Sequence, residues 1–127
     1  MFTEVVEKHG TIDIVINFQG ICPSTDFQGR MWDITPESFE AVMQVNLQSV
    51  YFLCQCVSEY YIANKICGNI LNIASTEGLK GCVVPYGISK AGVVSLTKGF
   101  GKIRIIWNSC EWYRSRSNCC RDDENTR

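Results

Sequence analysis

The fold can be predicted from one stretch, Gly68-Asn-Ile-Leu-Asn-Ile-Ala-Ser-Thr-Glu-Gly-Leu-Lys-Gly-Cys-Val-Val-Pro-Tyr-Gly-Ile-Ser-Lys90. Residues 68–74 form an apolar run that predicts a strand, and Ser75 stands at its carboxyl end. A loop with two glycines then leads into a helix that begins near Tyr86. Tyr86 and Lys90 stand at positions i and i+4, so they share one face of that helix.

This order of residues predicts proton transfer. A nearby ammonium favours the phenolate form of a tyrosine, which makes Tyr86 a candidate general acid/base with Lys90 as its partner. Open α/β sheets bind ligands at the carboxyl ends of their strands, so Ser75 is placed to hold a substrate oxygen. The alternative for Ser75 is a hydroxyl that bonds only its own loop.

The same Tyr-x-x-x-Lys spacing occurs a second time, at Tyr61 and Lys65. No strand that ends in serine leads into this second pair, and the pair closes a helix instead of opening one. The spacing alone is therefore weak, and one pair is a chance occurrence. The order strand, hydroxyl, loop and helix favours Tyr86 and Lys90.

The flanking segments predict an α/β fold. Residues 1–9 are typical of a helix that Gly10 ends, and the β-branched run 11–17 is typical of a parallel strand buried on both faces. Thr35 can cap a helix that runs to about Asn64 and is apolar on more than one side, so it needs cover from a sheet and from another helix or subunit. Strand, helix, strand, helix is the middle βαβα portion of a doubly wound, Rossmann-like parallel sheet.

Composition narrows the function classes. The 127 residues are 46% hydrophobic and 20% charged, as in an ordinary globular domain, and the formal net charge of -1 favours neither nucleic acid nor an anionic membrane as a partner. The first ten residues do not resemble a signal peptide, and no apolar run approaches the roughly 18 residues of a membrane span, so we expect a cytoplasmic protein. Eight cysteines contain no Cys-x-x-Cys and His9 is the sole histidine, so no metal site is expected.

Four motifs in this order resemble the short-chain dehydrogenase/reductase family. Asp13-Ile-Val-Ile-Asn-Phe-Gln-Gly20 is similar to the family's strand that ends in Asn-Asn-Ala-Gly, and Val45-Asn46-Leu47 is similar to its helix with a catalytic asparagine. Asn72-Ile-Ala-Ser75 and Tyr86-x-x-x-Lys90 match its serine and its tyrosine and lysine. The resemblance covers residues 1 to about 102, which we expect to form a partial Rossmann-like domain.

The resemblance implies an oxidoreductase that uses NAD or NADP and moves a hydride between nicotinamide and a small alcohol or carbonyl substrate. Tyr86 would be the acid/base, Ser75 would orient the substrate oxygen, and Asn46 would hold a water on a proton relay to Lys90. For Asn46 the alternative is a polar residue tolerated inside a helix. The residues implied to bind the cofactor are Asn17, Gly20, Tyr86 and Lys90.

The sequence also departs from the family pattern. Phe18 and Gln19 replace the second Asn and the Ala of the Asn-Asn-Ala-Gly motif, and the loop from Ser75 to Tyr86 is shorter than usual. A glycine-rich phosphate loop, which the family places after its first strand, is absent. We therefore keep open a truncated, catalytically inactive product. A non-enzymatic fragment that pairs with full-length relatives, or a homo-oligomer, through the 36–64 helix is also open.

Residues 103–127 fit neither a structural period nor the family. Suitable synonymous codons for residues 106–119, read one nucleotide later and completed by the first nucleotide of Cys120, give Tyr-Gly-Ile-Arg-Val-Asn-Gly-Ile-Ala-Pro-Gly-Ala-Ile-Ala, which resembles the family's next strand and its Pro-Gly loop. We therefore expect an out-of-frame tail, which the coding DNA can test. Its arginines and aromatics do not predict nucleic-acid binding, because Asp122, Asp123 and Glu124 follow them.

Overall fold

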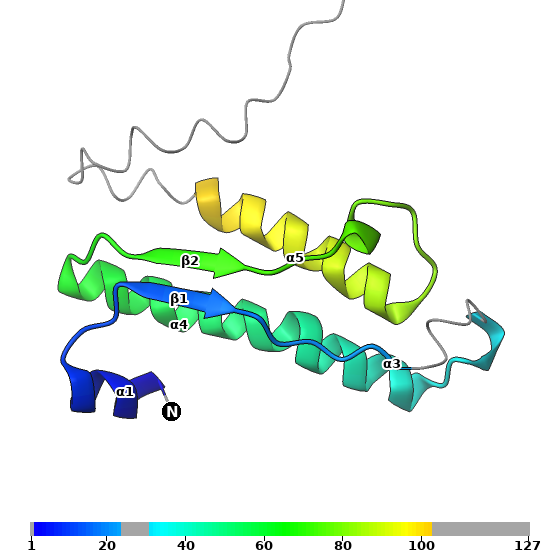
Figure 1. Ribbon diagram of the computed structural model, residues 1–127, viewed down its shortest axis with the longest axis horizontal. Helices are drawn as coiled ribbons and strands as arrows, with labels where there is room; N and C mark the ends of the chain where they lie inside the picture. Colours follow the sequence, from blue (N-terminus) through cyan, green and yellow to red (C-terminus); the bar gives the residue numbers. More distant parts are fainter. Residues whose placement is uncertain (1, 24–30, 103–127) are drawn as a thin grey trace, which may run out of the picture.

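The computed structural model describes residues 2–23 and 31–102, which form two layers (Figure 1). One layer is a parallel sheet of β1 (Ile14–Asn17) and β2 (Asn69–Asn72), and the other contains α4 (Ser49–Asn64) and α5 (Pro85–Lys102). The remaining elements are α1 (Phe2–His9), η1 (Met31–Asp33), α3 (Pro36–Met43), η2 (Gln44–Gln48) and η3 (Thr76–Gly78). The predicted out-of-frame tail, residues 103–127, lies outside the described residues.

The two strands pair in parallel with Ile14 opposite Asn69 and Asn17 opposite Asn72. The chain leaves β1, passes through the long helical segment that ends with α4, and returns as β2 beside it, which is the βαβ connection of an open α/β sheet. Helix α5 follows. The predicted fold class, the middle part of a Rossmann-like parallel sheet, is confirmed.

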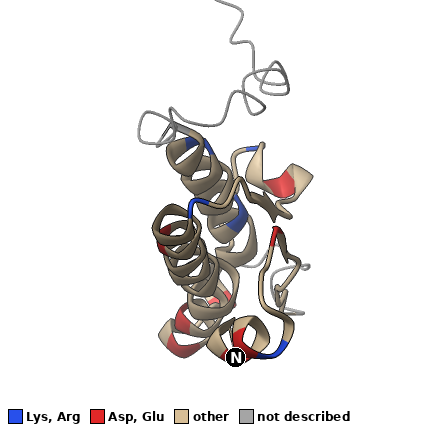
Figure 2. Cartoon of the chain, turned by 90° about the vertical axis from the view of Figure 1, so that its left-hand side faces the viewer, with Lys and Arg blue, Asp and Glu red and all other residues tan. Residues whose placement is uncertain are grey.

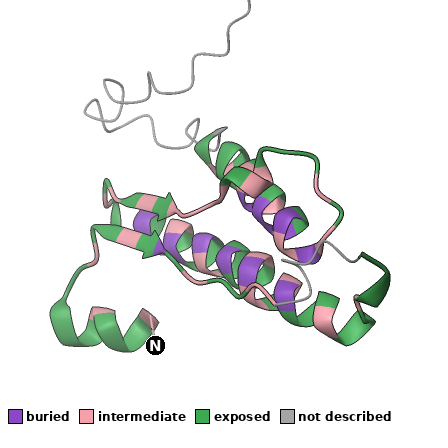
Figure 3. Cartoon of the chain, turned by 45° about the vertical axis from the view of Figure 1, so that its right-hand side comes forward, coloured by how far each residue is buried: buried purple, intermediate pink, exposed green. Residues whose placement is uncertain are grey.

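The sheet is covered on one face only. Ile70 packs against the core, and the buried Asn17 contacts Cys54 of α4. On the opposite face Ile14, Ile16 and Leu71 are 66%, 59% and 51% exposed (Figure 3). The prediction that the first strand is buried on both faces is therefore wrong, because α4 and α5 lie on the same side and no described element covers the other.

One continuous helical segment runs through α3, η2 and α4. Thr35 caps its start by accepting a hydrogen bond from the Ser38 N–H at 3.3 Å, with Pro36 in the first turn, and α4 ends at Asn64. Both ends agree with the prediction. The π-helical turn η2 in its middle was not predicted, and such a turn rotates the residues that follow it relative to a regular helix. The buried Asn46 lies within it.

The core lies between η2, the two long helices and the sheet. Buried Val50, Cys54 and Val93 form its centre, and partly buried apolar side chains pack around it: Leu47, Ile70, Ala74, Leu96 and Phe100. A Cβ on Gly92 would lie 2.8 Å from Leu47 Cδ2, so glycine at this position allows α5 to approach η2 closely. The close approach of α5 to η2 positions the residues of the candidate site.

Charged side chains are spread over several elements (Figure 2). Within residues 2–23 and 31–101 they are exposed, apart from the half-buried Glu77 and the buried Lys90. No helix in these ranges is long and apolar enough to cross a membrane. No cluster of three or more His, Cys, Asp and Glu residues in the same ranges could hold a metal ion.

Candidate active site

The first turns of α5 bring Tyr86 and Lys90 together. Pro85 begins the helix, and its fixed backbone angle suits a first helical position. The i, i+4 spacing then places the Lys90 ammonium 5.9 Å from the centre of the Tyr86 ring. The prediction that this spacing puts the phenol and the ammonium on one helix face is confirmed.

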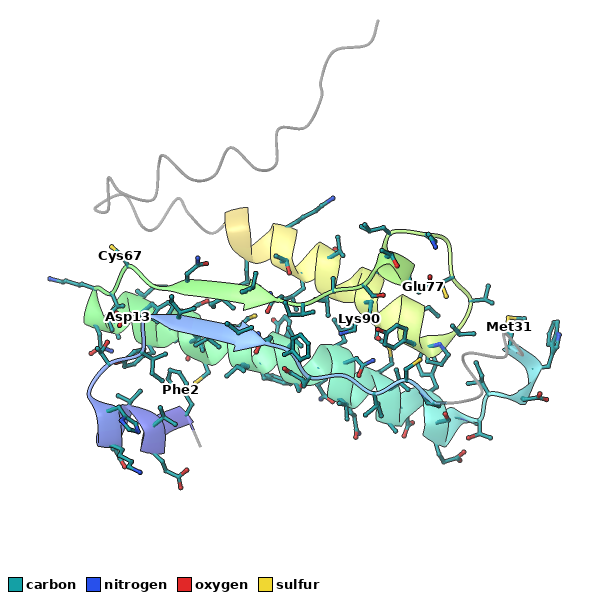
Figure 4. The ribbon with its side chains drawn as sticks, viewed as in Figure 1. Phe2, Asp13, Met31, Cys67, Glu77 and Lys90 are labelled. Carbon is teal, nitrogen blue, oxygen red and sulfur yellow. The ribbon has the colours of Figure 1, made fainter. Side chains whose placement is uncertain are left out.

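Lys90 is 5% exposed, which is unusual for a lysine. Its Nζ donates to the carbonyl oxygen of Ile73, at the end of β2, at a distance of 3.1 Å. Among the described residues no carboxylate forms an ion pair with it. Burial therefore lowers the pKa of the Lys90 amine, because the charged form loses solvation. Figure 4 shows the side chain inside the molecule, between α5 and the strand-end loops.

Asn46 lies at the centre of a hydrogen-bonded cluster and is completely buried. Its Oδ1 accepts from the Ile21 N–H at 2.8 Å, and its Nδ2 donates to the Ile21 carbonyl at 2.9 Å and to Ser89 Oγ at 3.1 Å. Both amide hydrogens are thus used. The side chain fixes the loop after β1 to η2, and these bonds leave it no amide hydrogen to donate to a water.

Gly20 lies against Lys90. A Cβ at this position would be 3.3 Å from Lys90 Nζ and 3.6 Å from Asn46 Oδ1, so a larger residue would crowd the ammonium. The structure therefore brings together Gly20, Asn46, Tyr86 and Lys90 of the predicted set. The cofactor role predicted for Gly20 stays a prediction.

Asn17, the other predicted cofactor residue, is 2% exposed. Its Nδ2 donates to Asn72 Oδ1 at 2.6 Å and lies 3.6 Å from Cys54 Sγ, while Asn72 Nδ2 donates to Thr97 Oγ1 at 3.0 Å. These contacts tie the ends of both strands to α4 and α5. The geometry gives Asn17 a structural role at the strand ends, and its predicted contact with the cofactor stays a prediction.

Ser75 caps the short η3 turn. Its Oγ accepts from the Glu77 N–H at 3.3 Å, which matches the alternative that its hydroxyl bonds its own loop. The shortened loop fits because two glycines allow close contact. A Cβ on Gly78 would be 2.6 Å from the Lys90 backbone carbon, and one on Gly87 would be 2.3 Å from Cys82 Sγ. The loop is thus packed directly on α5.

Phe18 and Gln19, which replace the second Asn and the Ala of the Asn-Asn-Ala-Gly motif, lie in different environments. Phe18 is 78% exposed, whereas Gln19 Nε2 donates to Ser49 Oγ at 3.1 Å. Ser49 in turn donates to the Val45 carbonyl at 2.6 Å, inside the π-helical turn. Gln19 therefore adds a second connection between the loop after β1 and the segment that carries Asn46.

The second Tyr-x-x-x-Lys pair has a structural role. The buried Tyr61 ring lies under Gly68, where a Cβ would come within 2.1 Å of it. Lys65 is exposed and ends α4 in the left-handed conformation with φ of 54°. Tyr61 therefore lies in the core and Lys65 at the helix end, and the two side chains do not form a site together. The sequence order favours the other pair, Tyr86 and Lys90.

Sequence reasoning missed Ser89, Gln19 and the packing role of Gly78. Ser89 is completely buried and donates to the Tyr86 carbonyl oxygen at 2.6 Å while accepting from Asn46. Its place next to Lys90 was a signal, since a serine there adjoins the predicted active-site lysine. Gly78 gave a weaker signal as a glycine in a loop that is short for the resemblance.

The family described as enoyl-(acyl carrier protein) reductase matches residues 1–102 of the chain, which is most of its length. The chain belongs to the short-chain dehydrogenase/reductase family. The resemblance inferred from the four motifs is thereby confirmed. Members named among its relatives are dehydrogenases and reductases, so the family is one of oxidoreductases.

Two curated relatives in this short-chain dehydrogenase/reductase family illustrate the similarity. The 3-oxoacyl-(acyl-carrier-protein) reductase FabG of Thermotoga maritima is 35% identical over 101 residues, covering 78% of this chain and 39% of that protein. The L-rhamnose 1-dehydrogenase (NADP(+)) of Thermoplasma acidophilum is 39% identical over 114 residues, covering 85% and 43%. The chain thus spans about two fifths of the length of these relatives.

Solved short-chain dehydrogenase structures are similar as well. A short chain dehydrogenase from Bacillus anthracis superposes with a TM-score of 0.67 at 28% identity, covering 82% of this chain and 42% of that one. A 4-hydroxyisoleucine dehydrogenase complexed with NADH gives 0.72 at 30% identity, covering 84% and 46%. Neighbours with bound nicotinamide nucleotides support NAD or NADP as the cofactor of the family.

Proposed function

We propose that this chain carries the proton-transfer part of an oxidoreductase site that uses NAD or NADP and acts on a small alcohol or carbonyl substrate. The observation that supports this most strongly is the Lys90 ammonium, buried next to Tyr86 with no carboxylate partner among the described residues. A buried cation without a counter-ion is costly for a fold, and such groups are concentrated at functional sites.

In this proposal Tyr86 gives a proton to, or takes one from, the substrate oxygen. Lys90 lies beside the Tyr86 ring and offers its remaining hydrogens to the nicotinamide ribose. Ser75 orients the substrate oxygen by donating its hydroxyl hydrogen, while its Oγ accepts from the Glu77 N–H. Asn46 acts through the backbone geometry around Lys90, because its side-chain amide is already committed to Ile21 and Ser89.

The residues present fit the nicotinamide-ribose end of NAD or NADP. The buried Lys90 ammonium donates to one described protein acceptor, the Ile73 carbonyl, so it retains hydrogens that can be donated to the ribose hydroxyl groups. Gly20 leaves space beside the ammonium that a Cβ would fill. When bound, the nucleotide supplies the hydride-transfer chemistry. A cytoplasmic location stays a prediction from the sequence.

A nucleotide titration tests this proposal. NADH and NADPH are added to the full chain while nicotinamide fluorescence is followed, with Lys90→Met as the altered site and Lys98→Met as the control on an exposed position of the same helix. We expect saturable binding that weakens about tenfold or more in Lys90→Met, which corresponds to about 1.4 kcal/mol. The control should bind like the unaltered chain. No saturable binding of either nucleotide would support the catalytically inactive alternative instead.

We also propose that two copies of the chain associate through the long helices. An open groove of about 960 Å³ lies between the α3–α4 segment and α5, and its lining is mainly apolar. Phe52 and Tyr51, on its wall, are 55% and 48% exposed. Exposed aromatic surface of this kind is typical of protein interfaces. This groove supports the predicted interface at the 36–64 helix.

Size-exclusion chromatography with light scattering tests the association. We expect a dimer or higher oligomer for the unaltered chain and a monomer for Phe52→Glu, because a carboxylate would be buried without a partner in the interface. Gln55→Glu, at an exposed position one turn further along α4 and outside the groove lining, is the control. A monomeric unaltered chain at every concentration tested would contradict the proposal.

A further inference from the structure

A continuous set of hydrogen bonds links the loop after β1 to the first turn of α5. It begins at the backbone of Ile21, which exchanges two bonds with the Asn46 amide, at 2.8 and 2.9 Å. Asn46 Nδ2 then donates to Ser89 Oγ at 3.1 Å, and Ser89 donates to the Tyr86 carbonyl at 2.6 Å. Two intermediate members, Asn46 and Ser89, are each 0% exposed. The middle of the set therefore lies inside the protein, while its two ends are the exposed Ile21 and the half-buried Tyr86.

This connection ends on the residues of the site. Ser89 stands between Tyr86 and Lys90 in the sequence, and its hydroxyl accepts the hydrogen bond that the Asn46 side chain donates to α5. The Lys90 side chain has two further restraints, the Ile73 carbonyl at 3.1 Å and the close position of Gly20. Those two restraints act on the Lys90 side chain, whereas Ser89 holds the helix backbone from which both Tyr86 and Lys90 project.

We propose that Ser89 is a positioning residue that sets the place of Tyr86 and Lys90 relative to Gly20 and Asn46. This inference rests on the proposed function for its meaning, because the placement matters most when Tyr86 and Lys90 act on bound molecules. The hydrogen bonds that Ser89 makes do not require a bound cofactor. Without the hydroxyl, Asn46 Nδ2 loses a buried acceptor, and the first turn of α5 loses its hydrogen bond to η2.

A purely structural Ser89 would behave differently. Removing a buried hydrogen bond lowers the stability of any fold, so a loss of stability alone does not separate the two roles. A positioning role also changes the surroundings of Lys90. When the turn is released, water reaches the ammonium and its titration moves toward that of an ordinary lysine. Among the described residues, Tyr86 is a titratable side chain that lies against Lys90, while Glu77 of η3 pairs with Lys80 at 3.4 Å.

The test is competitive acetylation of the full chain with trace acetic anhydride across a range of pH, with mass spectrometry of each lysine. Exposed Lys65, Lys80 and Lys98 serve as internal references. The variants are Ser89→Ala, Ser89→Thr, which keeps the hydroxyl, and Ser95→Ala, an exposed position of the same helix. Denaturant unfolding is measured first for each, so that only cooperatively folded variants are compared.

We expect the reaction profile of Lys90 to shift upward in pH in Ser89→Ala, to return to that of the unaltered chain in Ser89→Thr, and to stay unchanged in Ser95→Ala. An unchanged Lys90 profile in a folded Ser89→Ala overturns the proposal. If Ser89→Ala does not unfold cooperatively, Ser89→Cys is used, because a thiol is a weaker partner, and the same criterion applies. Nucleotide titration of the unaltered chain judges the proposed function separately, since acetylation requires no cofactor.

Discussion

Two tyrosine–lysine pairs with identical spacing stand on two neighbouring helices and have opposite environments. At the start of α5, the Lys90 ammonium is buried 5.9 Å from the Tyr86 ring centre. At the end of α4, Tyr61 is in the core and Lys65 is exposed beyond the last helical turn. Spacing determines only that two side chains share a helix face. The element that precedes the helix determines whether that face meets a site.

Replacement of the two tyrosines by alanine should separate the pairs by the largest margin. Tyr61 is 2% exposed and packs under Gly68, so Tyr61→Ala should lower the free energy of unfolding by about 3–5 kcal/mol. Tyr86 is only half-buried, and Tyr86→Ala should cost clearly less. Denaturant unfolding measures both. Equal losses would show that the two rings are packed alike.

Glycine replacements test the contact of the short loop with α5. Gly78→Ala would place a Cβ 2.6 Å from the Lys90 backbone carbon, and backbone atoms cannot move aside easily. We expect a loss of about 1–3 kcal/mol in unfolding free energy. Gly81→Ala, in the same loop with no atom within 4 Å of the added Cβ, should change it little. Similar values for both variants would contradict the close packing.

The pH dependence of stability tests the burial of Lys90. Desolvation lowers its pKa in the folded state, so burying the cation costs stability at neutral pH, and this cost disappears as pH rises from the lowered folded pKa toward the ordinary lysine value of about 10.4. Lys90→Met should therefore be more stable than the unaltered chain at neutral pH, with the difference shrinking as pH rises. Lys98→Met provides the reference. A constant difference across that range would contradict the assignment.

The smallest effect is expected at Lys65. Its φ of 54° is strained for a residue with a Cβ, and glycine relieves that strain while losing more entropy on folding. Lys65→Gly should raise the free energy of unfolding by about 0.5–1 kcal/mol. Lys65→Ala, which keeps the strain, should give no gain. A loss of stability in Lys65→Gly would mean that the lysine side chain itself contributes.

The sequence predicted what depends on local order. The βαβα arrangement, the Thr35 cap, the helix end at Asn64 and the face shared by Tyr86 and Lys90 all follow from spacing and capping. The π-helical turn around Asn46 does not, because it depends on contacts made with the distant Ile21 and Ser89. Contacts between residues far apart in the chain leave no periodic pattern in the sequence.

The exposure of one sheet face was the main error. Ile14 and Ile16 have the composition of a strand covered on both sides, yet burial depends on which elements pack there, and a strand's own residues do not specify this. Ser75 illustrates a milder difficulty. A strand-end serine serves equally well as a cap or as a substrate contact, and its observed bond to Glu77 is compatible with the first role.

The central claim is that the Tyr86–Lys90 pair forms a nicotinamide nucleotide site and that the Tyr61–Lys65 pair does not. The most direct measurement is a fluorescence titration of NADH and NADPH against the unaltered chain, Lys90→Met and Lys65→Met side by side. We predict saturable binding that is lost or weakened about tenfold in Lys90→Met and retained in Lys65→Met. Equal weakening in both variants, or equal binding by both, would contradict the claim.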